Sequence, residues 1–431
     1  MLDTASQLAN NPSAVEAAGK PARSLRTDPP ETEANSSPSF SMAEARHIVR
    51  DLFAPSAVVY WADFLLSWSV GIVCFALVRQ FPLFSWQQVL LFLASSVLIY
   101  RAALFIHEIV HLRTGTFKAF RFIWNMLCGI PFLVPSFLYY THLDHHRRAH
   151  FGTARDGEYI PLGQQSPWAI LWYLCQPSFV PALAVIRFLV LTPLTWFDGP
   201  IRRFVYARAS SMVMDPSYVR PMPTKAMLRV WRFQELMVFL FCVTVAVFLI
   251  RGIVLDPPEE AYRRPVINAV LPLGFLAQVY ATGFFIAMVN NIRTLGAHRF
   301  INDGRELTFV EQLLDSVNYP KFSILAEMWG PVGLRYHALH HLFPSLPYHN
   351  LGRAHARLMA ELPADSPYRL TNSDSLRQSL VRLWEASLRS SRSRTSGELS
   401  SASSQSTTPV APLSVAKSAR PRPRRKSRNV R

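Results

Sequence analysis

The chain has 431 residues, which is enough for one large domain or two ordinary ones. Half of its residues are hydrophobic and only 17% are charged, which is too apolar for an ordinary soluble protein and indicates a membrane protein. The net charge is +17, but the segment from Arg389 to Arg431 carries eleven Lys and Arg against one acid. We therefore assign much of the basicity to a tail that lies near anionic lipid headgroups, and nucleic acid is the less favoured partner.

The N-terminal part of the chain is polar. Residues 1–40 are rich in Ala, Ser, Pro, Asn and Glu without periodicity, and they predict a disordered leader. They show no cleavable signal pattern, so we expect membrane insertion to rely on internal apolar segments. Residues 41–53 predict a short amphipathic helix at the membrane surface.

Several apolar runs follow this leader. Crossing a bilayer takes about 20 residues in a helix. Four runs, some with their flanks, meet this length, at residues 58–78, 89–106, 236–250 and 266–289. Two further apolar stretches, at residues 122–140 and 168–194, contain several prolines. We expect both to lie at the interface or to pack on the domain, because lipid-exposed irregular backbone does not occur inside a bilayer.

Four spans in two hairpins return the chain to its starting side each time. That side carries most of the Lys and Arg, whereas the turn at residues 79–87 holds one basic residue, so the positive-inside rule makes it cytoplasmic. We predict an all-α integral membrane protein of the bacterial inner membrane, with four transmembrane helices, a cytoplasmic helical cap and both termini cytoplasmic. The membrane domain is predicted over residues 41–389, and a disordered basic tail over residues 390–431.

Eight of the thirteen histidines fall into three tight groups beside the apolar runs. Within each group the spacing is i, i+3 or i, i+4, and on a helix these positions lie within a sector of about 100°. The side chains of one group therefore point the same way, as they do where a helix binds a metal ion. The predicted topology places all three groups on one membrane face. The groups are His107/His111, His142/His145/His146 and His337/His340/His341.

The number of histidines indicates more than one metal ion. Structural zinc takes about four ligands and catalytic zinc about three plus water, so eight imidazoles exceed the needs of one zinc ion. We expect two metal ions. Imidazole suits iron, copper and zinc alike, so the ligands alone do not select the metal. The four cysteines form no Cys-x-x-Cys pair, and thiolate ligands are not expected.

The three groups, spaced HxxxH, HxxHH and HxxHH with paired spans between them, resemble the integral-membrane fatty acid desaturases and related hydroxylases. The resemblance covers about residues 45–360 and includes the segments HHRRAHF at residues 145–151 and HHLFP at residues 340–344. The segment NIRTLGAHR, at residues 291–299, resembles the one that supplies these enzymes with a ninth histidine, here His298. The resemblance implies a di-iron centre of two Fe ions, held by these nine histidines, that activates O2 and removes two hydrogens from a fatty acyl chain.

One position departs from the family pattern. Some relatives have an Asn four residues before the ninth histidine that binds metal through water, and here that residue is Thr294. Asn291, two turns before His298, lies on nearly the same helical face and is an alternative. We further expect acids such as Asp144, Asp156 and Glu158 to orient imidazoles, with a surface or capping role equally open. His150 has the same two alternatives.

The resemblance also implies partners. The substrate is a fatty acyl group bound to a lipid, to coenzyme A or to a carrier protein, and the membrane lipid surrounds the enzyme. No haem-binding cytochrome b5 segment is evident in the sequence, so the electron donor is expected to be a separate ferredoxin or cytochrome b5.

Other functions compete with desaturation. Acyl-chain hydroxylation begins with the same hydrogen abstraction and stays open, although the Phe343-Pro344 context favours desaturation by resemblance. His107-Glu108-x-x-His111 also matches the HExxH motif of zinc proteases, with Glu108 as general base, but that function leaves six grouped histidines unused. A haem protein needs histidines that face each other from separate helices, and a metal transporter needs them near the membrane midplane.

Overall fold

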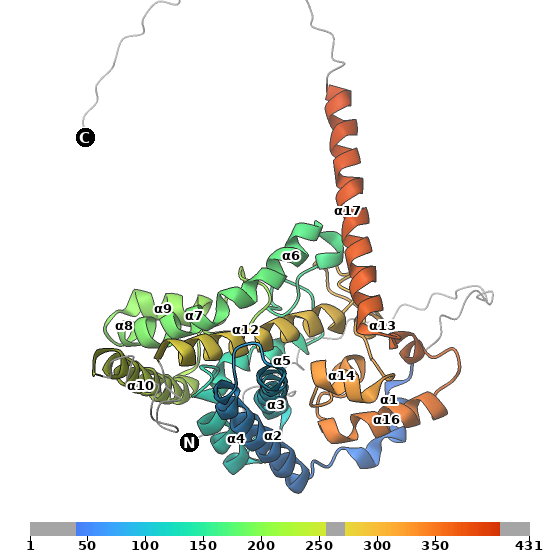
Figure 1. The fold of residues 1–431 in the computed structure, drawn as a ribbon. Coiled ribbons are helices and arrows are strands. Elements are labelled where there is room, and N and C mark those ends of the chain that lie inside the picture. Colours follow the sequence, from blue (N-terminus) through green and yellow to red (C-terminus); the bar gives the residue numbers. More distant parts are fainter. Residues whose placement is uncertain (1–39, 256–271, 406–431) are drawn as a thin grey trace, which may run out of the picture.

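The computed structural model describes residues 40–255 and 272–405 of the chain. Within these ranges the protein is helical, with isolated β-bridges and no β-strand. The predicted leader and most of the predicted tail lie outside the described residues. The last helix, α17, continues from Leu376 to Gln405, so the predicted domain boundary at residue 389 falls inside it (Figure 1).

The four predicted spans correspond to the four longest helices before α17. Ser56 and Ser85 begin the first two, because each hydroxyl accepts a hydrogen bond from a backbone amide of the first helical turn. The last span is described from Pro272 onward, and the predicted start at residues 266–271 lies outside the described chain. The four helices are α2 (Ala57–Leu77), α3 (Trp86–His111), α10 (Lys225–Leu255) and α12 (Pro272–Ala297).

A fifth stretch is also long and apolar enough to cross a membrane, at Val180–Phe197. We predicted an interfacial position for this stretch. It consists of α7 (Val180–Val185), a π-helical segment (Ile186–Leu191) and α8 (Thr192–Phe197). Its buried Arg187 forms an ion pair with Glu235 of α10. The described residues therefore form an all-helical membrane protein with five candidate spans, where four were expected.

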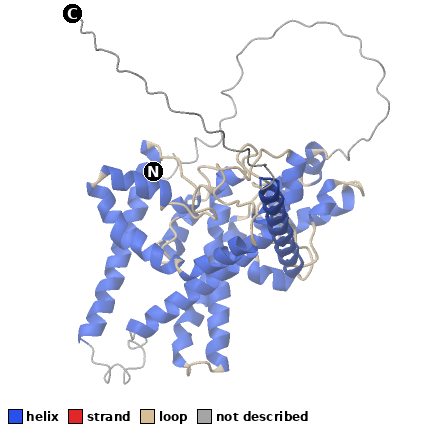
Figure 2. Cartoon of the chain, turned by 90° about the horizontal axis from the view of Figure 1, so that it is seen from above, coloured by secondary structure: helices blue, strands red, loops and turns tan. Residues whose placement is uncertain are grey.

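The long helices and most of the loops lie at different sides of the molecule. Figure 2 shows long helices projecting from one side and most loops and short helices at the other side. The short helices carry the rest of the fold. They are α1 (Met42–Ile48), α4 (Lys118–Trp124), α5 (His142–His145), α6 (Pro167–Cys175), α9 (Gly199–Arg208), α13 (Phe309–Asp315), α14 (Ser323–Trp329), α15 (His337–Leu342) and α16 (Tyr348–Glu361).

An aromatic core joins the α2–α3 hairpin to the C-terminal helices. The rings of Tyr60, Phe105, Phe120 and Tyr348 pack edge to face, with centroids 5.2–6.0 Å apart. Tyr348 also donates a hydrogen bond of 2.8 Å to Asp63 on α2. The hairpin and the histidine-bearing α15 region therefore form one packed unit.

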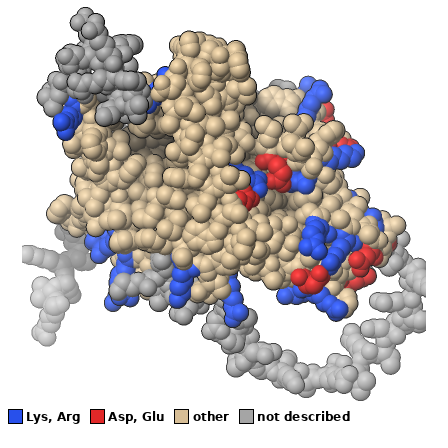
Figure 3. Space-filling model, turned by 60° about the horizontal axis from the view of Figure 1, so that its bottom comes forward, with Lys and Arg blue, Asp and Glu red and all other residues tan. Residues whose placement is uncertain are grey.

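The outer surface of the long helices is apolar. Leu66, Val73, Phe248 and Ile250 are each more than half exposed. Figure 3 shows a broad face without charged side chains, with Lys, Arg, Asp and Glu at its edges and in one patch. Exposed apolar surface of this extent is typical of helices that face lipid.

Candidate metal centre

The nine histidines predicted as metal ligands converge from four elements. His107 and His111 lie on the last turns of α3, and His298 directly follows α12. The triplet at His142, His145 and His146 forms α5 and its C-terminal cap. The second triplet, His337, His340 and His341, occupies α15. All four elements end or begin on the same side of the molecule, as the hairpin topology predicted.

The convergent imidazoles form two groups that could each hold one metal ion. In each group, the candidate ligand atoms all lie within 4.8 Å of one another. We call them the five-histidine group (His107, His111, His142, His146, His340) and the four-histidine group (His145, His298, His337, His341).

Each triplet contributes to both groups. On α5, His142 and His146 join the five-histidine group, and His145 joins the other. On α15, His337 and His341 join the four-histidine group, and His340 crosses to the five-histidine group. The reason is helical geometry, because positions i and i+4 lie about 40° apart whereas i+3 and i+4 lie about 100° apart. The HxxHH spacing thus directs two imidazoles to one metal position and one to the other.

Three carboxylates orient imidazoles through the second ring nitrogen. Nδ1 lies 2.8 Å from Glu158 in His142, 2.7 Å from Asp156 in His145 and 3.1 Å from Asp315 in His298. A carboxylate that accepts the Nδ1 proton leaves the lone pair on Nε2, the nitrogen that points into the groups. Glu158 and Asp156 were predicted in this role, whereas Asp315 was not.

The pKa values of Asp156 and Glu158 are shifted in opposite directions. Burial favours the neutral form of Asp156, but the His145 ring and the backbone amides of Gly152 and Glu158 outweigh it and hold the pKa of Asp156 below its ordinary value. The same contact keeps the pKa of His145 raised despite its burial. Burial raises the pKa of Glu158 to about 8, and the charges of His145 and Arg293 oppose this rise.

The donor set fits a pair of metal ions. Nε2 atoms of neighbouring imidazoles lie 2.9–3.2 Å apart in both groups. Two imidazoles bound at right angles to one first-row metal ion, each at about 2.1 Å, have their nitrogens about 3 Å apart. His145 and His298 both direct Nδ1 at a carboxylate, so their facing Nε2 lone pairs repel unless a cation lies between them.

The remaining candidates lie outside the two groups. Asp144 forms an ion pair with Arg147 and lies 3.3 Å from Nδ1 of His150, so neither Asp144 nor His150 contacts a grouped histidine through these contacts. Asn291 donates to the carbonyl of Tyr173, which turns its side chain toward α6. Thr294, not Asn291, lines the small cavity beside the histidines.

The other histidines have structural contacts. His47 contacts Arg50 at the exposed end of α1, and Nε2 of His349 accepts the Ser56 amide at the start of α2. His355 accepts a hydrogen bond from the hydroxyl of Tyr368. These contacts place all three histidines outside the two groups.

Glu108 makes no hydrogen bond to a grouped histidine in the described chain, and its Oε1 lies 4.0 Å from Nδ1 of His107. Its carboxylate accepts the hydroxyl of Tyr60 and the backbone amide of Tyr348, inside the aromatic core. A general base must reach the water or substrate that it deprotonates. The sequence therefore matches the HExxH motif, but Glu108 stabilises the packing of α3 against α2 and α16 instead of acting as a general base.

Sequence comparisons agree with this geometry. The sequence model of the family described as "Fatty acid desaturase" matches residues 84–372, which include all nine histidines. The chain belongs to the fatty acid desaturase family. A protein of Caulobacter vibrioides (strain NA1000 / CB15N) named "Ceramide hydroxylase" is similar to this desaturase-family chain, at 35% identity over 345 residues, which cover 78% of this chain and 91% of that protein.

Membership of the desaturase family accounts for the features found independently. The family consists of membrane-bound oxidoreductases that act on lipids and typically hold two iron ions. The apolar helices and the two histidine groups fit these properties. Both desaturases and hydroxylases belong to the family.

Proposed function

We propose that this protein is an O2-dependent hydroxylase of the acyl chain of a membrane lipid, with a ceramide-like lipid as substrate. The observation that carries the proposal is the pair of buried histidine groups with acid-oriented rings at the ends of apolar helices. The similarity to the relative named ceramide hydroxylase favours hydroxylation over desaturation. Desaturation is the second candidate, and the family match supports it.

The reaction consumes an external reductant. In hydroxylation, one C–H bond of the lipid, one O2, two electrons and two protons give one C–OH bond and one water molecule. Two iron ions, when bound by the nine histidines, supply the activation of O2. The protein itself holds the imidazoles in one tautomer, excludes water from the buried site and positions the lipid. A separate ferredoxin or cytochrome b5 is proposed to deliver the electrons.

We also propose the arrangement in the membrane. The histidine groups and both termini face the cytoplasm, since that side carries most of the Lys and Arg. The leader over residues 1–40, the membrane domain over residues 41–389 and the basic tail over residues 390–431 remain our proposed divisions of the chain. A bacterial inner membrane is the proposed location.

Expression in a host that makes ceramide but lacks hydroxylated lipids tests the function. We expect mass spectrometry of the extracted lipids to show acyl chains that carry one more oxygen, and only when an electron donor is present. Chains that have lost two hydrogens instead would support desaturation. His340→Ala is the matched inactive control, with membrane insertion intact. Unchanged lipids, with iron bound and a donor supplied, would contradict both functions.

A further inference from the structure

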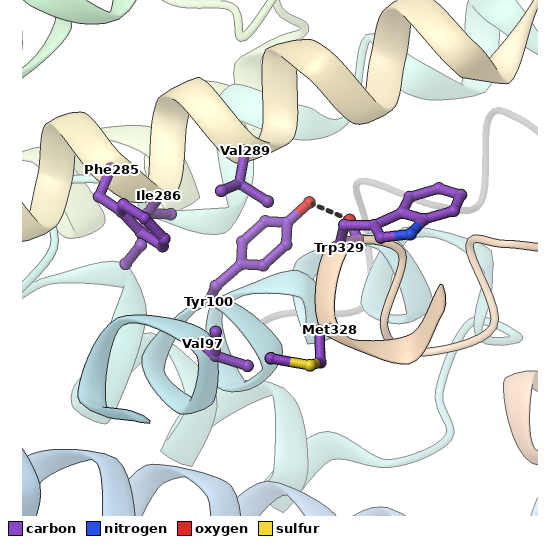
Figure 4. A pocket seen from close by; sticks show the side chains of 7 residues that line it. All are labelled: Val97, Tyr100, Phe285, Ile286, Val289, Met328 and Trp329. Carbon is purple, nitrogen blue, oxygen red and sulfur yellow. Dashed lines mark hydrogen bonds between the residues drawn. The ribbon is translucent and has the colours of Figure 1, made fainter. Parts of the chain in front are cut away.

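An apolar pocket lies in the membrane region beside the histidine groups. Its volume is about 160 Å³, and its walls come from α3, α12 and α14. Figure 4 shows Tyr100 between Val289 of α12 and Met328 of α14, with its hydroxyl hydrogen-bonded to the carbonyl of Trp329 at 3.3 Å. A pocket with this lining is suited to a hydrocarbon chain.

A second, smaller cavity of about 20 Å³ lies against the histidines, and α12 lines both cavities. Val289 faces the apolar pocket, and Arg293 faces the small cavity. The two residues are one helical turn apart, about 6 Å along the axis. Asn290 links the two cavities, since it contacts one lining residue of each. Its Oδ1 atom lies 3.4 Å from the hydroxyl of Tyr100 and 3.2 Å from Nη2 of Arg293.

Arg293 is a buried cation without an ion-pair partner in the described chain. Its relative exposure is 9%, and its hydrogen bonds go to the uncharged side chains of Asn290 and Thr294. Among the described residues, Nε of Arg293 has no hydrogen-bond partner. A buried charge with an unsatisfied donor costs stability, and such groups persist where a ligand completes them.

A matching acceptor lines the same small cavity. Glu158 contacts His142 through Oε2, whereas Oε1 is buried and has no hydrogen-bond partner in the part of the chain that the structure describes. Besides the ring nitrogens of His107 and His337 that lack a partner among the described residues, the cavity thus presents the unsatisfied N–H of Arg293 and one unsatisfied carboxylate oxygen. A single group that carries both an acceptor and a donor satisfies the two together.

We propose that Arg293 and Glu158 hold the amide group of an N-acyl lipid beside the histidine groups. Nε–H of Arg293 donates to the amide carbonyl oxygen, Oε1 of Glu158 accepts the amide N–H, and the acyl chain runs along α12 into the apolar pocket. An ester or a free fatty acid offers a carbonyl oxygen to Arg293 but no amide N–H to Glu158. Arg293 is therefore a positioning residue, and Glu158 provides the specificity for an amide. This inference rests on the proposed function and specifies its substrate.

Equilibrium binding tests the inference separately from turnover. The full-length, iron-loaded protein in nanodiscs is titrated with a short-chain ceramide, its N-methyl derivative and the matched ester. We expect the wild type to prefer the amide over both analogues by about tenfold or more, the equivalent of one charge-assisted hydrogen bond. Arg293→Gln should weaken the binding of all three ligands, because each of them carries the carbonyl that Arg293 holds, and Arg293→Lys should restore part of the lost affinity.

Turnover and a matched variant complete the test. Arg293→Gln should raise KM for the ceramide more than it lowers kcat, with iron content unchanged. Arg121→Gln removes another arginine of 9% exposure that does not line the small cavity, and it should keep the wild-type affinity for the ceramide. Unchanged ceramide affinity in Arg293→Gln, or no amide preference in the wild type, overturns the inference. If the wild type binds the amide selectively but oxidises no lipid, the proposed function fails and the assignment of Arg293 stands.

Discussion

Oδ2 of Asp315 lies 3.1 Å from Nδ1 of His298, across 17 residues of sequence. The isolated bridge between His298 and Ser316 brings the two segments together. Oδ1 of the same carboxylate accepts the hydroxyl of Tyr159 and the amide of Ile301, so Asp315 is itself held in place. Its position makes it the orienting acid of the ninth histidine.

Removal of Asp315 should weaken the four-histidine group. Loss of an acid that orients a metal-binding imidazole typically costs about 10- to 100-fold in metal affinity, so we expect Asp315→Ala to lower iron affinity by that factor. Asp315→Asn keeps an acceptor and should lose less. Iron titration of the purified protein measures the effect, and the exposed Asp303→Ala is the control. Unchanged affinity in Asp315→Ala would contradict the orienting role.

The two histidine groups should bind iron separately. We expect two iron ions per chain in the wild type and about one in His298→Ala, because the five-histidine group does not include His298. His340→Ala should instead affect the five-histidine group. Elemental analysis of the purified protein gives the ratio. His47→Ala, at an exposed position on α1, should retain both ions. Loss of both ions in every single variant would show that the groups act as one site.

Glu108 should be dispensable for the chemistry. Loss of a general base costs roughly 100-fold or more in rate, whereas Glu108→Gln, which keeps an acceptor for Tyr60, should cost less than that in product formation. We expect a lowered melting temperature, because the buried contacts with Tyr60 and Tyr348 are weakened. If the Glu108→Gln variant has full iron content but forms no product, Glu108 takes part in the reaction and the prediction is wrong.

Acid should destabilise the protein partly through His355. Burial lowers the pKa of His355 from 6.5 to about 4. A histidine with a lowered pKa stabilises the fold above pH 6.5, and this stabilisation is lost as the pH falls toward 4, because the unfolded chain binds the proton first. The loss reaches about 3 kcal/mol. Melting temperatures of wild type and His355→Gln, compared from pH 7.5 to 4.5, should converge at the acid end. Parallel curves would contradict the assignment.

The ion pair between Arg187 and Glu235 should fix the fifth apolar stretch to α10. Arg187 also donates to Thr192 and Ser210, and the glutamate accepts from Tyr206. Removal of one partner of a buried pair costs about 3–5 kcal/mol, so Glu235→Ala should lower the melting temperature strongly. The double variant Arg187→Met/Glu235→Leu should recover part of the loss. A double variant no better than the single one would show that the uncompensated charge is not the cause.

The local sequence pattern was sufficient to predict the long helices of the fold. Apolar length identified α2, α3, α10 and α12, and the serine caps of α2 and α3 are local features as well. The stretch at Val180–Phe197 shows the limit of such reasoning. Its prolines argued for the interface, whereas the structure pairs its Arg187 with Glu235, which is 48 residues away. Pairing at that distance has no signal in a single sequence.

The sequence by itself indicated eight histidines and the side of the membrane domain on which they meet, through helical periodicity and hairpin topology, and the family resemblance added His298. The tertiary structure decided how the histidines divide. His340 and His145 each belong to a different histidine group from the other two members of their triplet. The reason is the packing of α3, α5 and α15, which determines which histidines lie next to each other. The same packing recruits Asp315, turns Asn291 toward α6 and withdraws Glu108 into the aromatic core. These outcomes depend on contacts between distant segments, and only packing in three dimensions specifies them.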